Sequence, residues 1–204
     1  MATPSTVSVP PTRVARWVEN FGARHGGVVF SVDAGGLNGV ATDGSTFAAE
    51  APFDRAYDGT ASVEPFVESC RPPDDWGVLL VRKGGFAIAR LTGETLVESK
   101  TGQRHVQGRT KAGGQSQQRF ARRRDNQARV AYEAASEHAA RILGGVPLLV
   151  TGGDHAAVEA VLADRRLAGM VVVQPFLAVP DPRRGVLEQA ILDAGNVRIS
   201  VVNA

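Results

Sequence analysis

The sequence predicts an α/β fold in which helices pack on a mixed sheet and a basic loop and helix project from it. Strands and helices alternate over the last third of the chain, and three consecutive strands precede them. Between these regions, residues 115–143 contain nothing that breaks a helix. With 204 residues and 43% apolar composition, the chain is long enough to bury a core. We therefore expect a single domain over residues 12–204.

The first third of the chain is expected to begin with a flexible tail, because residues 1–11 are polar and rich in proline. Val14, Trp17, Val18 and Phe21 recur at the spacing of one helix face and predict a helix over 13–23. Runs of β-forming residues follow, and then a short apolar stretch that ends at two prolines. They predict strands over 27–32, 37–41 and 45–49 and a short helix over 63–70.

The middle of the chain predicts a meander, because glycine turns separate successive runs of β-forming residues. The expected strands are 76–82, 86–91 and 95–100, with a further strand at 104–108. Gly144 and Gly145 are expected to end the long helix. The elements predicted after it are a strand at 147–150, a helix at 154–164, a strand at 169–173, a helix at 183–194 and a strand at 197–202.

Composition argues against several classes of protein. A single cysteine, Cys70, excludes an internal disulfide and a cysteine-based zinc cluster, and four histidines without ligand spacing give no support to a metal site. We expect no cofactor. The N-terminal residues lack the features of a signal peptide, and the longest uncharged apolar stretch, 167–180, is shorter than the roughly 20 residues of a membrane span. These features predict a cytoplasmic protein that does not enter a membrane.

The net charge of +2 conceals an uneven distribution. Residues 100–129, the basic window, hold nine basic side chains and one acidic side chain, so their charge is +8 and that of the other 174 residues is −6. Such a concentration is typical of a segment that binds nucleic-acid phosphates. The basic residues are Lys100, Arg104, Arg109, Lys111, Arg119, Arg122, Arg123, Arg124 and Arg129.

The two halves of the predicted long helix differ. Polar and basic residues surround its first half, where Phe120 is the one large apolar side chain. At about 1.5 Å per residue the helix is roughly 43 Å long. We expect its first half to project as part of a basic arm, residues 101–127. The second half suits packing on a sheet, because it has an apolar stripe at Ala128, Ala131, Ala135, His138, Ala139 and Ile142.

Gly113-Gly114-Gln115 stands at the tip of this arm. Glycines without a Cβ permit positive φ and let backbone N–H groups approach a ligand closely. The amide of Gln115 does not ionise and cannot be a general base, but it can position a water molecule and donate a hydrogen bond to a developing oxyanion. These properties suffice to hydrolyse an activated ester beside RNA phosphates.

The same residues resemble a known family. Gly113-Gly114-Gln115-Ser116, followed by Arg119-Phe120-Ala121-Arg122 and Arg124, is similar to the GGQ region of the catalytic domain of class-1 translation termination factors of eukaryotes and archaea. We expect no stop-codon-reading domain in a chain of this length. It therefore resembles more closely the stand-alone bacterial VLRF-type (Vms-like release factor) peptidyl-tRNA hydrolases. The resemblance implies a ribonuclease-H-like catalytic domain that hydrolyses the peptidyl-tRNA ester on stalled or split ribosomes.

The resemblance also implies roles for individual residues. Gln115 takes the place of the water-positioning glutamine, and Gly113 and Gly114 give the backbone freedom for its insertion. Gln117 is a second candidate, because the eukaryotic relatives have a looser Gly-x-x-Gln pattern. The expected partners are the large ribosomal subunit with its RNA and peptidyl-tRNA, and we expect the chain to be monomeric. The expected RNA-binding residues are Arg109, Lys111, Arg119, Arg122, Arg123 and Arg124.

Two other functions stay open at this point. One is an RNA endonuclease that cuts tRNA near its acceptor end, and the other is a non-catalytic module that binds the ribosome through the basic arm. Asp33, at the end of a predicted strand, is interpreted as a turn residue rather than as a carboxylate of a two-metal nuclease site. Asp154 is interpreted as a helix cap, because the Lys-Ser/Thr pair of a P-loop is missing.

Overall fold

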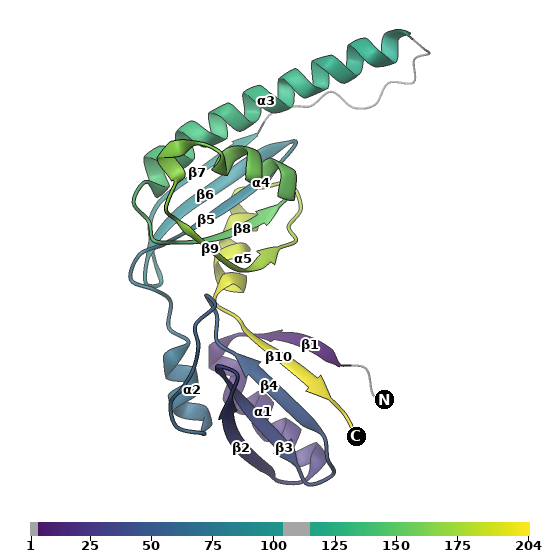
Figure 1. Ribbon diagram of the computed structural model, residues 1–204, viewed down its shortest axis with the longest axis vertical. Coiled ribbons are helices and arrows are strands. Elements are labelled where there is room, and N and C mark those ends of the chain that lie inside the picture. Colours follow the sequence, from purple (N-terminus) through teal and green to yellow (C-terminus); the bar gives the residue numbers. More distant parts are fainter. Residues whose placement is uncertain (1–3, 104–114) are drawn as a thin grey trace. The chain divides into compact units, whose positions relative to one another are not determined.

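Figure 1 shows the computed structural model, which describes residues 4–103 and 115–204 and the side chains of 4–103 and 129–204. The chain divides into two compact units: residues 1–72 with 191–204, the N-terminal unit, and residues 73–190, the central unit. Each has a five-stranded sheet and its own hydrophobic core. The predicted α/β class is confirmed. The sequence predicts one domain over residues 12–204, whereas the contacts separate two units.

The N-terminal unit is an antiparallel sheet in the order β1-β10-β4-β3-β2, with α1 packed on one face. Val14, Val18 and Phe21 of this helix are buried, as their spacing predicts. Phe21 meets Phe47 of the sheet edge to face, with ring centroids 5.2 Å apart. The elements are β1 (Ser5–Val9), α1 (Pro11–His25), β2 (Val28–Asp33), β3 (Gly36–Ala41), β4 (Thr46–Glu50), α2 (Val63–Ser69) and β10 (Val197–Val202).

The predicted flexible tail is wrong for residues 5–9. These residues form β1, which pairs antiparallel with β10 from Ser5 opposite Val201 to Val9 opposite Val197. Pro11 then opens α1, since proline suits the first turn of a helix, where its missing N–H costs nothing. The polar start of the chain is thus an edge strand whose partner lies near the other end of the sequence.

The central unit contains the predicted mixed sheet, in the order β7-β6-β5-β8-β9. β5 pairs antiparallel with β6 and parallel with β8, and β8 pairs parallel with β9. Helices α3 and α4 pack on the sheet through a core that includes Leu79, Ile88, Ala139 and Val158. The elements are β5 (Trp76–Arg82), β6 (Gly85–Thr92), β7 (Thr95–Gln103), α3 (Gln115–Leu143), β8 (Leu148–Gly153), α4 (His155–Leu162), the 3₁₀ helix η1 (Arg165–Leu167) and β9 (Val171–Leu177), and α5 (Arg184–Ala194) begins in this unit. Among the described residues, no helix is both long and apolar enough to cross a membrane.

Candidate functional site

The GGQ motif stands between β7 and α3 in the chain. β7 ends at Gln103, and Gln115 is the first residue of α3. The predicted helix over 115–143 is confirmed at both ends. Of the predicted site residues, Arg109, Lys111, Gly113 and Gly114 lie outside the described residues, as does the expected strand at 104–108. The helix also holds six further candidates, whose side chains lie outside the described part: Gln115, Gln117, Arg119, Arg122, Arg123 and Arg124.

β7 ends at the edge of the sheet where the parallel strands also end. β7 is parallel to β5, because both run antiparallel to β6. Gln103 pairs with Gly85, and Gly85 pairs with Arg82, so the last residues of β7 and β5 share one edge. Val81 is in register with Gly153, the last residue of β8. The chain therefore enters residues 104–115, the motif segment, from the carboxyl edge of the parallel strands, where α/β proteins commonly bind ligands.

A stripe of small and aliphatic residues fixes the second half of α3 to the sheet. Ala135, Ala139 and Leu143 have no exposed surface, and Ile142 is 1% exposed. Gly77 of β5 allows the close approach, since a Cβ at this position would lie 2.5 Å from Leu143 Cδ2. Within the described side chains, the predicted apolar stripe is confirmed. The sheet thus holds α3 at its C-terminal end, and Gln115 is the first residue at its N-terminal end.

An aromatic ring joins the strand before the motif to the helix after it. Phe86 of β6 lies against Gly102 of β7, where an added Cβ would be 2.4 Å from the ring. The same ring packs on His138 of α3, with ring centroids 5.5 Å apart. This contact lies next to Gln103, the last residue of β7, and so helps to fix the base of the motif segment.

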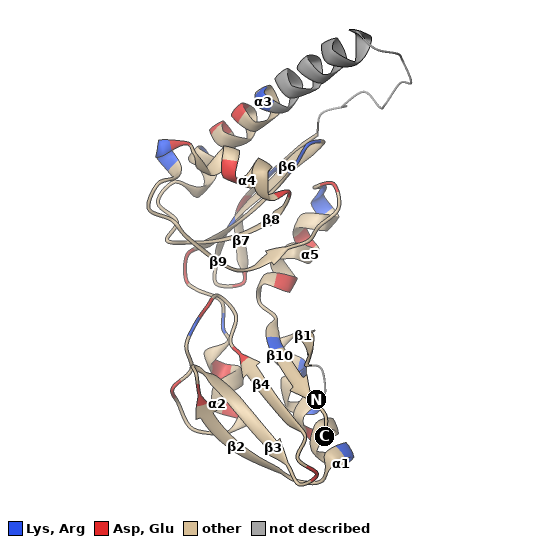
Figure 2. Ribbon diagram, turned by 45° about the vertical axis from the view of Figure 1, so that its right-hand side comes forward, with Lys and Arg blue, Asp and Glu red and all other residues tan. Residues whose placement is uncertain are grey.

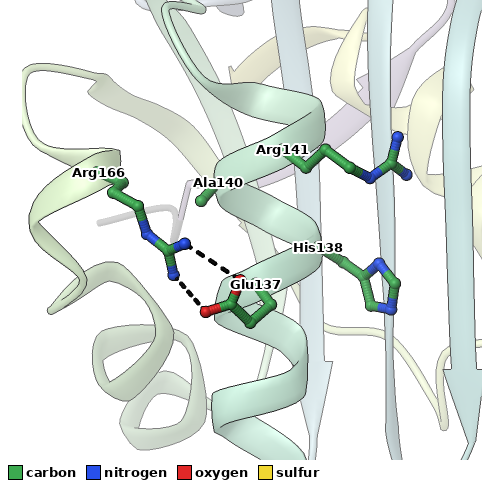
Figure 3. A pocket seen from close by; sticks show the side chains of 5 residues that line it. All are labelled: Glu137, His138, Ala140, Arg141 and Arg166. Carbon is green, nitrogen blue, oxygen red and sulfur yellow. Dashed lines mark hydrogen bonds and ion pairs between the residues drawn. The ribbon is translucent and has the colours of Figure 1, made fainter.

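Ion pairs restrain the exposed face of α3. The Arg166 guanidinium of η1 donates to both carboxylate oxygens of Glu137 on α3, over 2.9 and 3.1 Å (Figure 3). It also donates to Asp164 over 2.7 and 3.0 Å, and Arg141 of α3 pairs with Glu98 of β7. Hydrogen bonds from Arg166 lower the pKa of Glu137 and, with the Arg166 backbone N–H, lower the pKa of Asp164 to about 2. These pairs could not be predicted from the sequence, because no local pattern links Glu137 to Arg166.

A depression of about 470 Å³ lies between these groups (Figure 3). Its two guanidinium groups already face carboxylates, Arg141 facing Glu98 and Arg166 facing Glu137. An incoming anion would have to displace one of these partners, so we interpret the depression as part of the support of α3. It is lined by Glu137, His138, Ala140, Arg141 and Arg166.

Residues 74–200 match the model of the Actinobacteria/chloroflexi VLRF1 release factor. The match covers well over half of the chain and includes all of the central strands together with α3. The chain belongs to the VLRF1 release factor family. The predicted family is therefore confirmed.

Other comparisons give partial matches. Over 95 residues, which are 47% of its length, the chain is 34% identical to "Peptide chain release factor subunit 1" of Pyrococcus abyssi. The match to the protein of the same name from Thermococcus onnurineus has the same identity and coverage. The match spans only 22% of each of these relatives. The chain is also similar to the crystal structure of an archaeal translation termination factor, aRF1, with a TM-score of 0.45 and 12% identity, over 95% of this chain and 64% of that chain.

Asp33 has a structural position at the end of a strand. It is the last residue of β2 and pairs with Gly36 at the start of β3. The two residues between them, Ala34 and Gly35, have φ of 50° and 75°. Two successive positive φ values are what the tight turn of a two-residue β-hairpin needs. The interpretation of Asp33 as a turn residue is confirmed.

The predicted capping role of Asp154 is confirmed for its position but wrong for its side chain. Asp154 occupies the N-cap position of α4, but its side chain makes no capping hydrogen bond. Its backbone N–H instead donates to the Val81 carbonyl of β5 over 2.8 Å. Gly153, with φ of 102°, makes this approach possible, because a Cβ there would lie 2.3 Å from the Val81 oxygen. The Asp154 carboxylate therefore has no role in the cap.

Acidic and basic residues are interspersed along the described parts of the ribbon (Figure 2). Several arginines pair with carboxylates across strands or between elements, as Arg90 does with Asp75 and Arg198 with Glu50. This mixture agrees with the net charge of −6 outside the basic window. The charge that can attract a polyanion is concentrated in residues 100–129.

Proposed function

We propose that this chain is a ribosome-associated peptidyl-tRNA hydrolase that releases nascent chains from stalled or split ribosomes. The observation that carries the proposal is the position of Gly113-Gly114-Gln115, which leads into a 29-residue helix inside the region that matches the VLRF1 release factor family. The relatives named peptide chain release factor subunit 1 support the same class of reaction.

In the proposed reaction, the side-chain amide of Gln115 orients a water molecule toward the ester carbonyl carbon of peptidyl-tRNA. The water oxygen bonds to this carbon, the bond to the ribose oxygen breaks, the peptide leaves as a carboxylic acid, and the ribose oxygen takes a proton. N–H donors of Gln115 and of the backbone at Gly113 and Gly114 stabilise the oxyanion that forms on the way. The reaction needs no cofactor.

RNA binding is proposed for the basic side chains around the motif. Arg109, Lys111, Arg119 and the run 122–124 would neutralise phosphates of ribosomal RNA and of the tRNA acceptor end. Each phosphate contact adds about 0.7–0.9 to the slope of log K against log salt. Replacing Arg122, Arg123 and Arg124 by alanine should therefore lower this slope by about two to three and weaken binding to the large subunit.

We propose that the chain acts as a monomer in the cytoplasm.

The test is peptide release from purified large ribosomal subunits that carry peptidyl-tRNA. Loss of one preorganised donor to an oxyanion typically costs about 10²–10³ in rate, so Gln115→Ala should reduce release by at least that factor and leave binding to the subunit unchanged. Gln117→Ala, two residues further along α3, tests the second candidate glutamine and should keep most of the activity. Full activity in Gln115→Ala together with loss of release in Gln117→Ala would assign the role to Gln117, and full activity in both variants would exclude the proposal.

The products of the same assay separate the other two functions. A hydrolase leaves an intact tRNA 3′ end and a free peptide, whereas an endonuclease leaves a shortened tRNA whose fragment still carries the peptide. A binding module shows neither product in any variant, although the Arg122, Arg123 and Arg124 replacements still weaken its affinity for the subunit.

A further inference from the structure

We propose that the carboxyl edge of the central sheet binds one unpaired nucleobase of RNA, which stacks on His155 and donates a hydrogen bond from an amino group to Asp154. The inference rests on the proposed function, because it adds a base contact to the phosphate contacts of the basic window. Its ligand class is single-stranded RNA with a base that has an exocyclic amino group.

The stacking surface is a pair of parallel rings. The ring of His155, the first residue of α4, lies on the ring of Phe176 in β9, with centroids 3.6 Å apart and planes 14° apart. Phe176 is half-buried and packs against the core of the central unit, whereas His155 is exposed. The core thus holds the lower ring, and the imidazole remains accessible on its other side. Nucleobases stack on aromatic and histidine rings presented in this way.

The carboxylate beside this surface is available as an acceptor. Asp154 is half-buried and makes no capping hydrogen bond. Burial raises the pKa of Tyr132 on α3, and the negative charge of Asp154 raises it further. The Asp154 carboxylate therefore lies near the Tyr132 ring as well as next to His155. A carboxylate accepts hydrogen bonds from the amino group of cytosine, whereas uracil presents a carbonyl oxygen at the same place. Asp154 therefore supplies selectivity as well as affinity.

Two cations at the same edge can bind the phosphates of such a strand. A Cβ at Gly84 would lie 3.6 Å from Asp181, so the β5–β6 turn with Lys83 and the loop before Arg183 are neighbours. Both side chains are exposed, and within the described part of the chain neither has an ion-pair partner. Sites for single-stranded nucleic acid combine cations of this kind with a stacking ring. β7, the strand that precedes the GGQ motif in the chain, ends at this same edge.

The test measures binding of the full chain to two fluorescein-labelled RNAs of equal length, oligocytidylate and oligouridylate, by fluorescence anisotropy at one salt concentration. We expect wild type to bind oligocytidylate at least about fivefold more tightly. His155→Ala should weaken that binding by at least about fivefold, whereas His155→Phe keeps the stack and the affinity. Asp154→Asn should bring the two dissociation constants to within about twofold, because an amide can face either base. The matched control, Glu159→Gln, removes one charge from the exposed face of α4 and should leave the ratio unchanged.

Equal binding of the two RNAs by wild type would overturn the inference, as would an unchanged ratio in Asp154→Asn. Unchanged oligocytidylate affinity in His155→Ala would also overturn it, provided that this variant has the unfolding midpoint of wild type. If the unfolding midpoint of His155→Ala falls, the Asp154→Asn result decides. Peptide release tests the proposed function separately. Base preference without any release activity supports the inference and rejects the function, whereas release without base preference does the reverse.

Discussion

The docking of α3 on β5 can be tested by a double-mutant cycle between Gly77 and Leu143. A Cβ at Gly77 would lie 2.5 Å from Leu143 Cδ2, 3.2 Å from Leu149 Cδ1 and 3.3 Å from the Ala89 oxygen. Gly77→Ala therefore overpacks this contact and should lower the free energy of unfolding by about 1–3 kcal/mol. Leu143 is fully buried, and Leu143→Ala should cost about 2–5 kcal/mol.

The two losses should not add, because Leu143→Ala removes the atom that the new Cβ meets most closely. We expect the double variant to be more stable than the sum predicts by at least about 1 kcal/mol, which is within the range measured for residues in contact. Recovery should be incomplete, since the contacts at 3.2 and 3.3 Å with Leu149 and Ala89 remain.

The assay needs a probe of the central unit alone. The chain has two tryptophans, Trp17 in α1 and Trp76 in β5. In a Trp17→Phe background, the fluorescence of Trp76 reports on the central unit, because this side chain is 2% exposed and donates from Nε1 to the Gly93 carbonyl over 2.8 Å. Urea unfolding of the four chains then gives the coupling free energy. Losses that add within about 0.5 kcal/mol would refute the close packing of α3 against Gly77.

Three further predictions concern the base of the motif segment and the buried thiol. Gly102→Ala places a Cβ 2.4 Å from the Phe86 ring, so we expect a lower thermal midpoint and slower peptide release; a midpoint equal to that of wild type would contradict this packing. Arg166→Met should raise the pKa of Asp164 from about 2 toward its ordinary value. Because the folded-state pKa of Asp164 is depressed, the stability that Arg166 adds is present above about pH 4 and is lost as the pH falls toward about 2. The gap in unfolding midpoint between wild type and Arg166→Met should close over that range, and a constant gap would exclude the role. Burial raises the pKa of Cys70 to about 11, so a thiol reagent should label it only after unfolding, and rapid labelling of the native chain would count against its burial.

The elements that could be predicted from the sequence are those that local signals define. The glycine pair after Leu143 fixes one end of α3, where Gly145 has φ of 83°, and its apolar stripe predicts the face that packs on the sheet. The strands at 76–82, 86–91 and 95–100 were predicted because glycine turns separate them. Sequence was also sufficient for the family, because the GGQ motif and its arginines follow one another without interruption.

What could not be predicted depends on partners that are distant in the sequence. β1 has too little apolar character to predict a strand by itself, and it forms because β10 offers it a hydrogen-bonding edge. Glu137 and Arg166 meet because α3 and η1 pack together. Asp154 has the residue type and position of a cap, yet the turn from β8 brings its backbone N–H to Val81 and leaves its side chain unused there. Propensity identifies elements, but tertiary packing decides how their side chains are used.

The position of Gln115 at one end of α3 makes the packing at the other end relevant to function. Between Leu143 and Gln115 the helix is about 42 Å long, so a tilt of about 3° at the sheet would move the far end by about 2 Å. Misplacement of a reacting group by about 1 Å can cost about 10²-fold in rate. The ion pairs of Glu137 and Arg141 are exposed and add little stability, as is usual for surface pairs. They oppose tilting, however, because one joins α3 to η1 and the other joins it to β7. Their loss should therefore reduce peptide release more than it reduces the free energy of unfolding.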